Sequence, residues 1–133
     1  NYEKKKVSRN KIIEMEMKKT GMLFSFCCVA PAIIKNKKNL ELRFFENVGS
    51  DIGLLFQISD DLIDHEGNSK IAGKKTGKDQ KKGKATLISL LGYDNAVKYS
   101  KDLIINIDKK LQKYGSNSKK IKQTLEYILN RDR

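Results

Sequence analysis

The stretch that decides the fold is residues 56–64, Phe-Gln-Ile-Ser-Asp-Asp-Leu-Ile-Asp, which closes an apolar segment that begins at Leu40. Apolar side chains recur there every three or four residues, at Phe44, Phe45, Val48, Ile52, Leu55, Ile58 and Leu62. This spacing predicts an amphipathic helix from Leu40 to Asp64. Because the segment is apolar around much of its circumference, we expect the helix to lie in the middle of a bundle.

Three carboxylates lie in what we expect to be the last turn of this helix. Asp60 and Asp64 are four residues apart and share a face, with Asp61 beside them. Like charges at this spacing repel, and carboxylates near a helix C-terminus face the negative end of the macrodipole. Oxygen ligands without His or Cys suit Mg²⁺, which usually takes one or two carboxylates plus substrate phosphates. The cluster therefore predicts a magnesium and diphosphate site, and the alternative is an acidic surface turn.

A glycine- and lysine-rich stretch at residues 66–84 is expected to form a loop. It contains Gly-Lys-Lys-Thr-Gly-Lys-Asp at 73–79 and leads into Gly-Lys-Ala-Thr at 83–86. Backbone and ammonium groups of such a loop can close over a diphosphate, and a solvated lysine loop is the alternative. The spacing of a P-loop is absent. Lys-Thr-Gly at 19–21 has the same two interpretations, as a phosphate contact or as a plain helix kink.

The remainder of the chain has a helical pattern. We expect helical regions at residues 3–30, 85–91, 94–114 and 118–130. Gly21 marks a kink or a close approach of the backbone to a ligand inside the first region, and Pro31 with the polar run at 35–39 marks its end. Gly115 ends the third region. Without a convincing strand pattern, the expected fold class is all-α.

Composition narrows the possible partners. The chain has 133 residues, enough for one domain, and a net charge of +12. Most of the positive charge is lysine, Trp is absent and arginine is scarce, so we do not expect nucleic-acid binding. Its apolar runs are too short for stable membrane insertion. The adjacent thiols Cys27 and Cys28 fit a reducing compartment, and we expect a cytoplasmic protein, or one of an organellar stroma or matrix in a eukaryote.

In combination, these motifs resemble the polyprenyl (isoprenyl) diphosphate synthase family, most closely its bacterial-type farnesyl and geranylgeranyl diphosphate synthases. The resemblance rests on five segments: Lys-Thr-Gly-x-Leu-Phe at 19–24, Gly-x-x-Phe-Gln-x-x-Asp-Asp-x-x-Asp at 53–64, Gly-Lys-x-x-Gly-x-Asp at 73–79, Gly-Lys-x-Thr at 83–86 and Tyr-Ile-Leu-Asn-Arg at 127–131. It implies a helical bundle of the isoprenoid synthase type. The implied enzyme is a trans-prenyltransferase that condenses an allylic diphosphate with isopentenyl diphosphate and requires Mg²⁺.

The resemblance also implies roles for individual residues. The implied metal-binding residues are Asp60 as a direct ligand, Asp64 in the water shell and Asp61 in a network of water or lysine. The implied diphosphate contacts are Lys19, Lys74 and Lys84. Thr20 and Gln57 would steady the reacting region, Phe56 would line the prenyl channel, and Arg131 would help to close the site.

One departure from the family pattern is large. The family carries a first aspartate-rich motif on an earlier helix, whereas the only Asp-Asp-x-x-Asp of this sequence is at 60–64. We therefore expect residues 1–133 to be the C-terminal half of one synthase domain, inactive alone, from a full-length protein that is a homodimer. The alternatives are a regulatory subunit of a heteromeric prenyl synthase, another class I terpenoid synthase, and a helical nucleic-acid-binding module.

Overall fold

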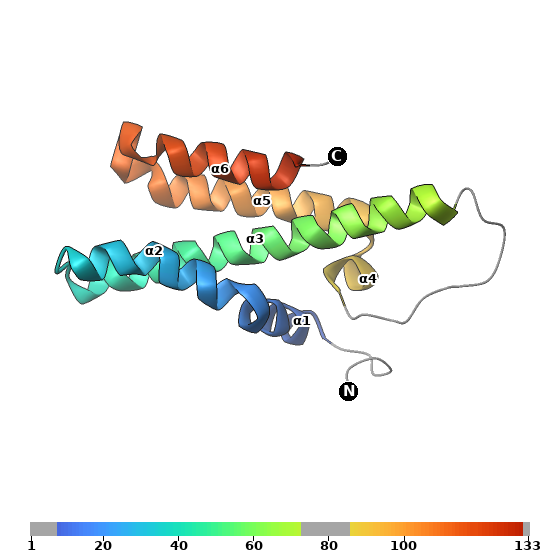
Figure 1. Ribbon diagram of the computed structural model, residues 1–133, viewed down its shortest axis with the longest axis horizontal. Coiled ribbons are helices and arrows are strands. Elements are labelled where there is room, and N and C mark those ends of the chain that lie inside the picture. The colour runs from blue at the N-terminus through green and yellow to red at the C-terminus, as the bar shows by residue number, and fades with distance from the viewer. Residues whose placement is uncertain (1–7, 73–85, 132–133) are drawn as a thin grey trace.

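The computed structural model describes residues 8–72 and 86–131, and these form helices and turns without a strand (Figure 1). The elements in chain order are α1 (Arg9–Glu16), the π-helical turn η1 (Met17–Gly21), α2 (Met22–Ile34), α3 (Asn39–Ala72), α4 (Leu87–Leu91), α5 (Tyr93–Leu111), the 3₁₀ segment η2 (Gln112–Ser118) and α6 (Lys119–Asn130). The predicted all-α class is confirmed. None of the helices in these two ranges is both long and apolar enough to cross a membrane.

Helix α3 is the central element, as its apolar circumference predicted. It contacts every other α-helix: α1 and α2 on one side, α5 and α6 on another, and α4 near its C-terminal end (Figure 1). Its side chains Leu55, Ile58 and Leu62 are fully buried in the core. The position of α3 in the bundle is therefore fixed by packing against five other helices.

The predicted end of this helix at Asp64 is wrong, because α3 continues to Ala72. Contacts with the start of α5 accompany the extension: the Tyr93 hydroxyl donates a hydrogen bond to Glu66, and the Tyr93 ring stacks on His65 with 5.4 Å between centroids. Residues 66–72 are thus helical rather than loop. Asp64 lies about two turns before the helix end, so the repulsion from the macrodipole that we expected does not apply there. The remainder of the predicted loop, residues 73–84, lies outside the described residues.

Glycines let α2 and α3 cross with their backbones in contact. A Cβ atom at Gly53 would lie 2.5 Å from Cα of Gly21, and one at Gly49 would lie 2.6 Å from the carbonyl oxygen of Phe24. At Gly21, which we had interpreted as a kink or a close approach to a ligand, the π-helical turn η1 ends and α2 follows directly. We expected Pro31 to end this helix, and that prediction is wrong. The helix runs on to Ile34 because the Pro31 carbonyl still accepts from the Lys35 amide at 3.1 Å.

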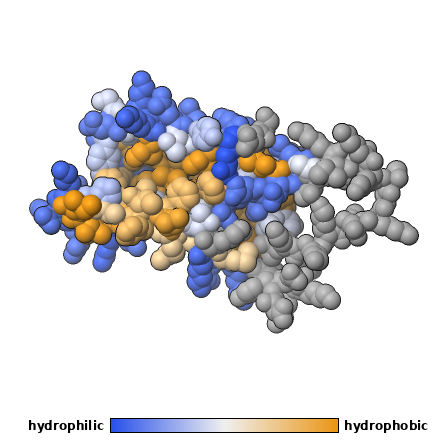
Figure 2. Space-filling model, in the orientation of Figure 1, coloured by the Kyte–Doolittle hydropathy of each residue, from blue (hydrophilic) through white to orange (hydrophobic). Residues whose placement is uncertain are grey.

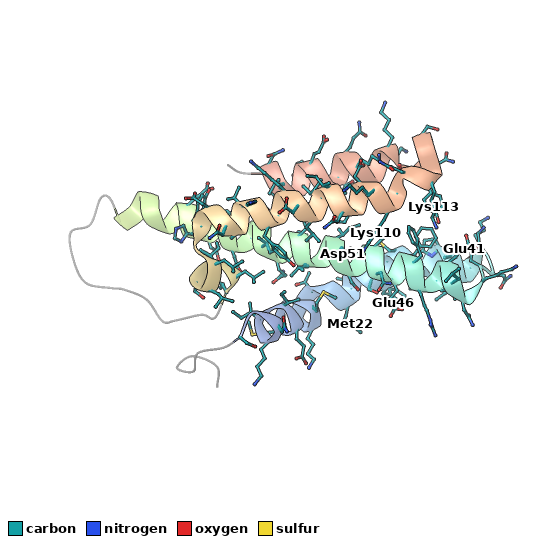
Figure 3. The ribbon with its side chains drawn as sticks, turned by 180° about the vertical axis from the view of Figure 1, so that it is seen from behind. Met22, Glu41, Glu46, Asp51, Lys110 and Lys113 are labelled. Atoms are coloured by element: carbon teal, nitrogen blue, oxygen red, sulfur yellow. The ribbon has the colours of Figure 1, made fainter. Side chains whose placement is uncertain are left out.

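Helices α5 and α6 form a hairpin that packs along α3. The turn uses Gly115, whose φ of 51° favours glycine. Helix α5 ends at Leu111, three residues earlier than predicted, because residues 112–118 form η2. Lys110 of α5 pairs with Asp51 of α3 at 2.5 Å, and the two labelled side chains meet between the helices in Figure 3. The hairpin brings the C-terminal end of α6 alongside the middle of α3.

Candidate functional site

The stretch of α3 from Gly53 to Asp64 collects contacts from segments that are far apart in the sequence. At its start, the crossing with Gly21 places the predicted Lys-Thr-Gly segment against it. One turn later, the rings of Phe24 and Phe56 lie 5.3 Å apart. Thr20, which precedes the crossing point, is half-buried. The structure therefore brings Thr20 and Phe56, two predicted site residues, to the same crossing of helices.

The C-terminal end of α6 delivers a second predicted residue to this stretch. The Arg131 guanidinium forms an ion pair with Asp60 and lies 4.1 Å from the centroid of the Phe56 ring. Its side chain is 17% exposed, against 46% for that of Asp60. The Nε atom of Arg131 is buried and has no hydrogen-bond partner in the described part of the chain, which fits a guanidinium held against an aromatic ring. Phe56, Asp60 and Arg131 thus form one contiguous cluster.

Ser59 holds α6 in the position that this cluster requires, and the sequence interpretation missed it. The Ser59 hydroxyl is fully buried and donates a hydrogen bond of 2.5 Å to the carbonyl oxygen of Ile128. That carbonyl belongs to the last turn of α6, where backbone acceptors lack a partner within the helix. Its spacing was the available signal, because Ser59 shares a helical face with the buried Leu55 and Leu62, and buried hydroxyl groups are normally hydrogen-bonded.

The three aspartates have different environments. Asp60 pairs with Arg131, Asp61 is half-buried and Asp64 is exposed. Their oxygens are hard ligands, and Mg²⁺ usually needs only one or two carboxylates besides substrate phosphates. Within residues 8–72 and 86–131, however, no three His, Cys, Asp or Glu side chains surround a common metal position. The donor set therefore fits magnesium only as part of a site to which other groups contribute oxygens.

The other predicted site residues divide into two groups. Gln57 lies next to Phe56 on α3 and is 3% exposed, so it belongs to the interior of the bundle. Lys74 and Lys84 lie outside the described residues. Lys19 lies in η1, but its side chain is also outside the described set. Of the predicted loop motif only Thr86 is described, and it caps α4 by accepting a hydrogen bond from the Ser89 amide at 3.1 Å.

Comparison with known proteins identifies relatives over nearly the whole chain. The family model described as Polyprenyl synthetase matches residues 1–128. Farnesyl diphosphate synthase of Micrococcus luteus is 29% identical over 131 residues, which are 98% of this chain and 45% of that protein. Farnesyl diphosphate synthase of Bacillus subtilis is 33% identical over 109 residues, which are 82% of this chain and 36% of that protein.

A solved structure supports the fold independently. The crystal structure of a geranyltransferase from Helicobacter pylori superposes with a TM-score of 0.67 at 20% identity, over 97% of this chain and 41% of that one. The chain spans less than half the length of each of these relatives and corresponds to their C-terminal half. The chain belongs to the polyprenyl synthetase family, and its all-α bundle is the C-terminal part of the isoprenyl synthase fold.

Proposed function

We propose that this chain is the C-terminal half of a trans-prenyltransferase domain, which condenses an allylic diphosphate with isopentenyl diphosphate and releases diphosphate. The chain would supply one wall of the diphosphate and magnesium site and would be inactive alone. One observation carries the proposal: segments around Gly21 and Arg131 both reach the stretch of α3 that holds Phe56 and Asp60. Recognition of a diphosphate bound to magnesium requires polar and cationic groups beside the aspartates, and these two segments are positioned to supply them.

The side chains in this wall suit ionisation of an allylic diphosphate. When bound, Mg²⁺ would be held directly by Asp60 and through its water shell by Asp64, with Asp61 in a network of water or lysine, and would stabilise negative charge on the departing diphosphate. Lys19, Lys74 and Lys84 would add cationic contacts to the same group. Gln57 and Thr20 would orient the prenyl group, and the Phe56 ring would shield the cationic carbon from water.

The ion pair with Arg131 adds a requirement to this proposal. Because Arg131 already neutralises Asp60, Asp60 can act as a metal ligand only if the guanidinium moves or shares the carboxylate. Arg131 would then be free to contact diphosphate oxygens, for which a guanidinium is well shaped. The C-terminal end of α6 would close over the substrate in this way.

Binding measurements on this chain test the proposal. Titration with inorganic pyrophosphate should give a binding signal that depends on added Mg²⁺. The double change Asp60→Asn and Asp64→Asn should weaken that binding by at least about tenfold, or about 1.4 kcal/mol. Asp102→Asn, at an exposed position of α5, serves as the matched control and should leave it unchanged. A pyrophosphate affinity that is unchanged by added Mg²⁺ and by the two aspartate substitutions would contradict the proposed site.

A second measurement addresses the expected inactivity. The purified chain, given allylic and isopentenyl diphosphates with Mg²⁺, should release no diphosphate above background. In an assembled synthase that contains this half, Asp60→Ala should lower turnover by at least about a hundredfold, because the metal contact is lost. Turnover by the 133-residue chain alone would overturn the view that it is half of a catalytic centre.

A further inference from the structure

The turn between α2 and α3 carries the two most exposed large hydrophobic side chains in the described part of the chain. Ile34, the last residue of α2, is 77% exposed, and Leu40, the second residue of α3, is 82% exposed. Three exposed lysines, Lys35, Lys37 and Lys38, lie between them in the sequence. We call these five side chains the α2–α3 tip.

The α2–α3 tip lies at one end of the molecule. Figure 1 shows this turn at the end of the bundle that is far from both chain termini. In the space-filling view, hydrophobic surface reaches the same end and has hydrophilic residues around it (Figure 2). The candidate site begins at Gly53, about 20 Å further along α3 at the usual rise per residue. The tip is therefore a surface feature apart from the candidate site.

Backbone hydrogen bonds hold the turn in one shape. Asn36 has a φ of 50°, in the left-handed region that asparagine tolerates. The Lys37 amide donates to the carbonyl oxygen of Ala32 at 3.0 Å, and the Glu41 amide donates to that of Lys38 at 2.9 Å. These bonds close the end of α2 and the start of α3. The apolar and cationic side chains are thus presented on a preformed turn, which lowers the entropic cost of binding.

The charge of the turn is strongly one-sided. Residues 33–43 contain four cationic side chains and one carboxylate, that of Glu41, whose Oε1 lies 3.7 Å from the Lys37 ammonium. Lysine can lay its aliphatic stem along apolar surface while its ammonium group stays in a polar layer. Exposed aliphatic side chains flanked by lysines suit the boundary between the headgroups and acyl chains of a bilayer, where anionic lipids add electrostatic attraction.

We propose that the α2–α3 tip is a peripheral contact site for an anionic lipid bilayer. Ile34 and Leu40 enter the headgroup layer, and the three lysines of the tip contact lipid phosphates. A second copy of this chain suits the tip less well, because the lysines of two tips would repel each other. Burial under another protein would remove water from the same lysines at a high cost. Nucleic acid would attract the lysines but offers no apolar layer for the two aliphatic side chains. This contact goes beyond the proposed function and does not depend on it.

A tryptophan at the tip reports insertion directly, because the chain has no other tryptophan. The fluorescence emission of Leu40→Trp should shift to shorter wavelength when vesicles of phosphatidylcholine and phosphatidylglycerol are added at low salt, since the side chain leaves water. Vesicles of phosphatidylcholine alone should give a smaller shift. Tyr127→Trp is the matched control, because Tyr127 is 70% exposed but lies on α6, and its emission should not change.

Co-sedimentation with the same mixed vesicles measures the contribution of the lysines. Replacing all three lysines of the tip by Gln should lower the affinity about a hundredfold, since each lysine near an anionic surface contributes about fivefold. Lys11→Gln, Lys98→Gln and Lys101→Gln together remove the same charge from exposed positions on α1 and α5. This control should lower the affinity less than about fivefold. Circular dichroism confirms that both variants remain helical.

The aliphatic side chains have their own control. Ile34→Ser with Leu40→Ser should lower the vesicle affinity at least about tenfold without a change of charge. Ile105→Ser with Tyr127→Ser changes two exposed apolar side chains on α5 and α6 and should leave the affinity unchanged.

Four results would overturn the assignment. The first is a Leu40→Trp emission that is already at short wavelength without vesicles and shifts on dilution, which would place the tip against a second copy. The second is an equal loss of affinity in the two lysine variants, which would mean adsorption through net charge alone. The third is binding to duplex DNA but not to vesicles, and the fourth is no binding to mixed vesicles. Pyrophosphate binding is measured apart from vesicle binding, so either proposal can fail while the other stands.

Discussion

Helices α2 and α6 both pack against α3, yet they present opposite surfaces to solvent. Helix α6 buries Leu125, Ile128 and Leu129 and exposes Lys119 and Lys120. Helix α2 buries a serine and an alanine and exposes five large apolar residues, although Phe24 packs on Phe56. The comparison shows that α6 has the polarity of an ordinary surface helix, whereas α2 has the composition of an interior helix. The two helices also differ in what holds them to α3, which is side-chain packing for α6 and backbone contact through glycines for α2.

The largest contrast should come from one substitution made on both helices. Leu125→Ala removes a side chain that is 1% exposed and leaves a cavity, which should lower the free energy of unfolding by about 3 kcal/mol. Leu23→Ala on α2, where the side chain is 64% exposed, should change it by less than about 0.5 kcal/mol in the chain alone. Urea denaturation followed by circular dichroism measures both. Equal losses would show that Leu23 is already covered in solution.

The glycine contact is the next largest effect. Gly53→Ala adds a Cβ atom 2.5 Å from Cα of Gly21, so the two helices must separate, and we expect a loss of about 2 kcal/mol. Gly67→Ala is the matched control on the same helix, because nothing lies within 4 Å of its added Cβ. The control should gain up to about 1 kcal/mol from helix propensity. Gly53→Ala with unchanged stability would mean that α2 is not held by backbone contact.

The positions of the helices could be predicted from the sequence because apolar residues recur at helical spacing. The apolar spacing on α3 correctly predicted a central helix, whereas Gly21, interpreted as a kink or an approach to a ligand, lies against the backbone at Gly53. The predicted end of α3 was wrong because the extension is accompanied by the contact of Glu66 with Tyr93, which lies 27 positions later in the sequence. Local sequence patterns do not contain such a contact. Pro31 was predicted to end the helix because proline lacks the amide that would bond to a carbonyl of the preceding turn, yet α2 contains Pro31 and continues to Ile34.

Candidate site residues could be named from the sequence only where the side chain has a distinctive charge or belongs to a recognised motif. The aspartates stood out by charge, and Arg131 was named only through the resemblance to the family's C-terminal helix. Ser59 did not stand out, because its role follows from the docking of α6, 69 positions away. The spacing of Gly49 and Gly53 on one helical face was a usable sign of close helix packing that we did not interpret. What remained hidden were the contacts between distant segments.

A smaller effect is expected where α6 is tied to α3 by a hydrogen bond. Ser59→Ala removes the donor to the Ile128 carbonyl and should cost about 1 kcal/mol, because that buried acceptor loses its partner. Thr124→Ala removes an exposed hydroxyl that bonds within α6, at 2.9 Å from the Lys120 carbonyl, and is the control. It should change stability by less than about 0.5 kcal/mol. Unfolding curves in which Thr124→Ala costs as much as Ser59→Ala would remove the reason to treat Ser59 as the anchor of α6.

The smallest effect should be the ion pair at the end of α6. Asp60 is 46% exposed, so water screens its attraction to Arg131. A double-mutant cycle with Asp60→Asn and Arg131→Gln should give a coupling below about 1 kcal/mol that decreases as salt is added. A weak pair is what the proposed function needs, because Asp60 must exchange a guanidinium for a metal ion without unfolding the helix that carries it. A coupling several times larger that is insensitive to salt would make Arg131 a fixed structural partner, and the α6 end would then be as permanently attached to α3 as the glycine contact makes α2.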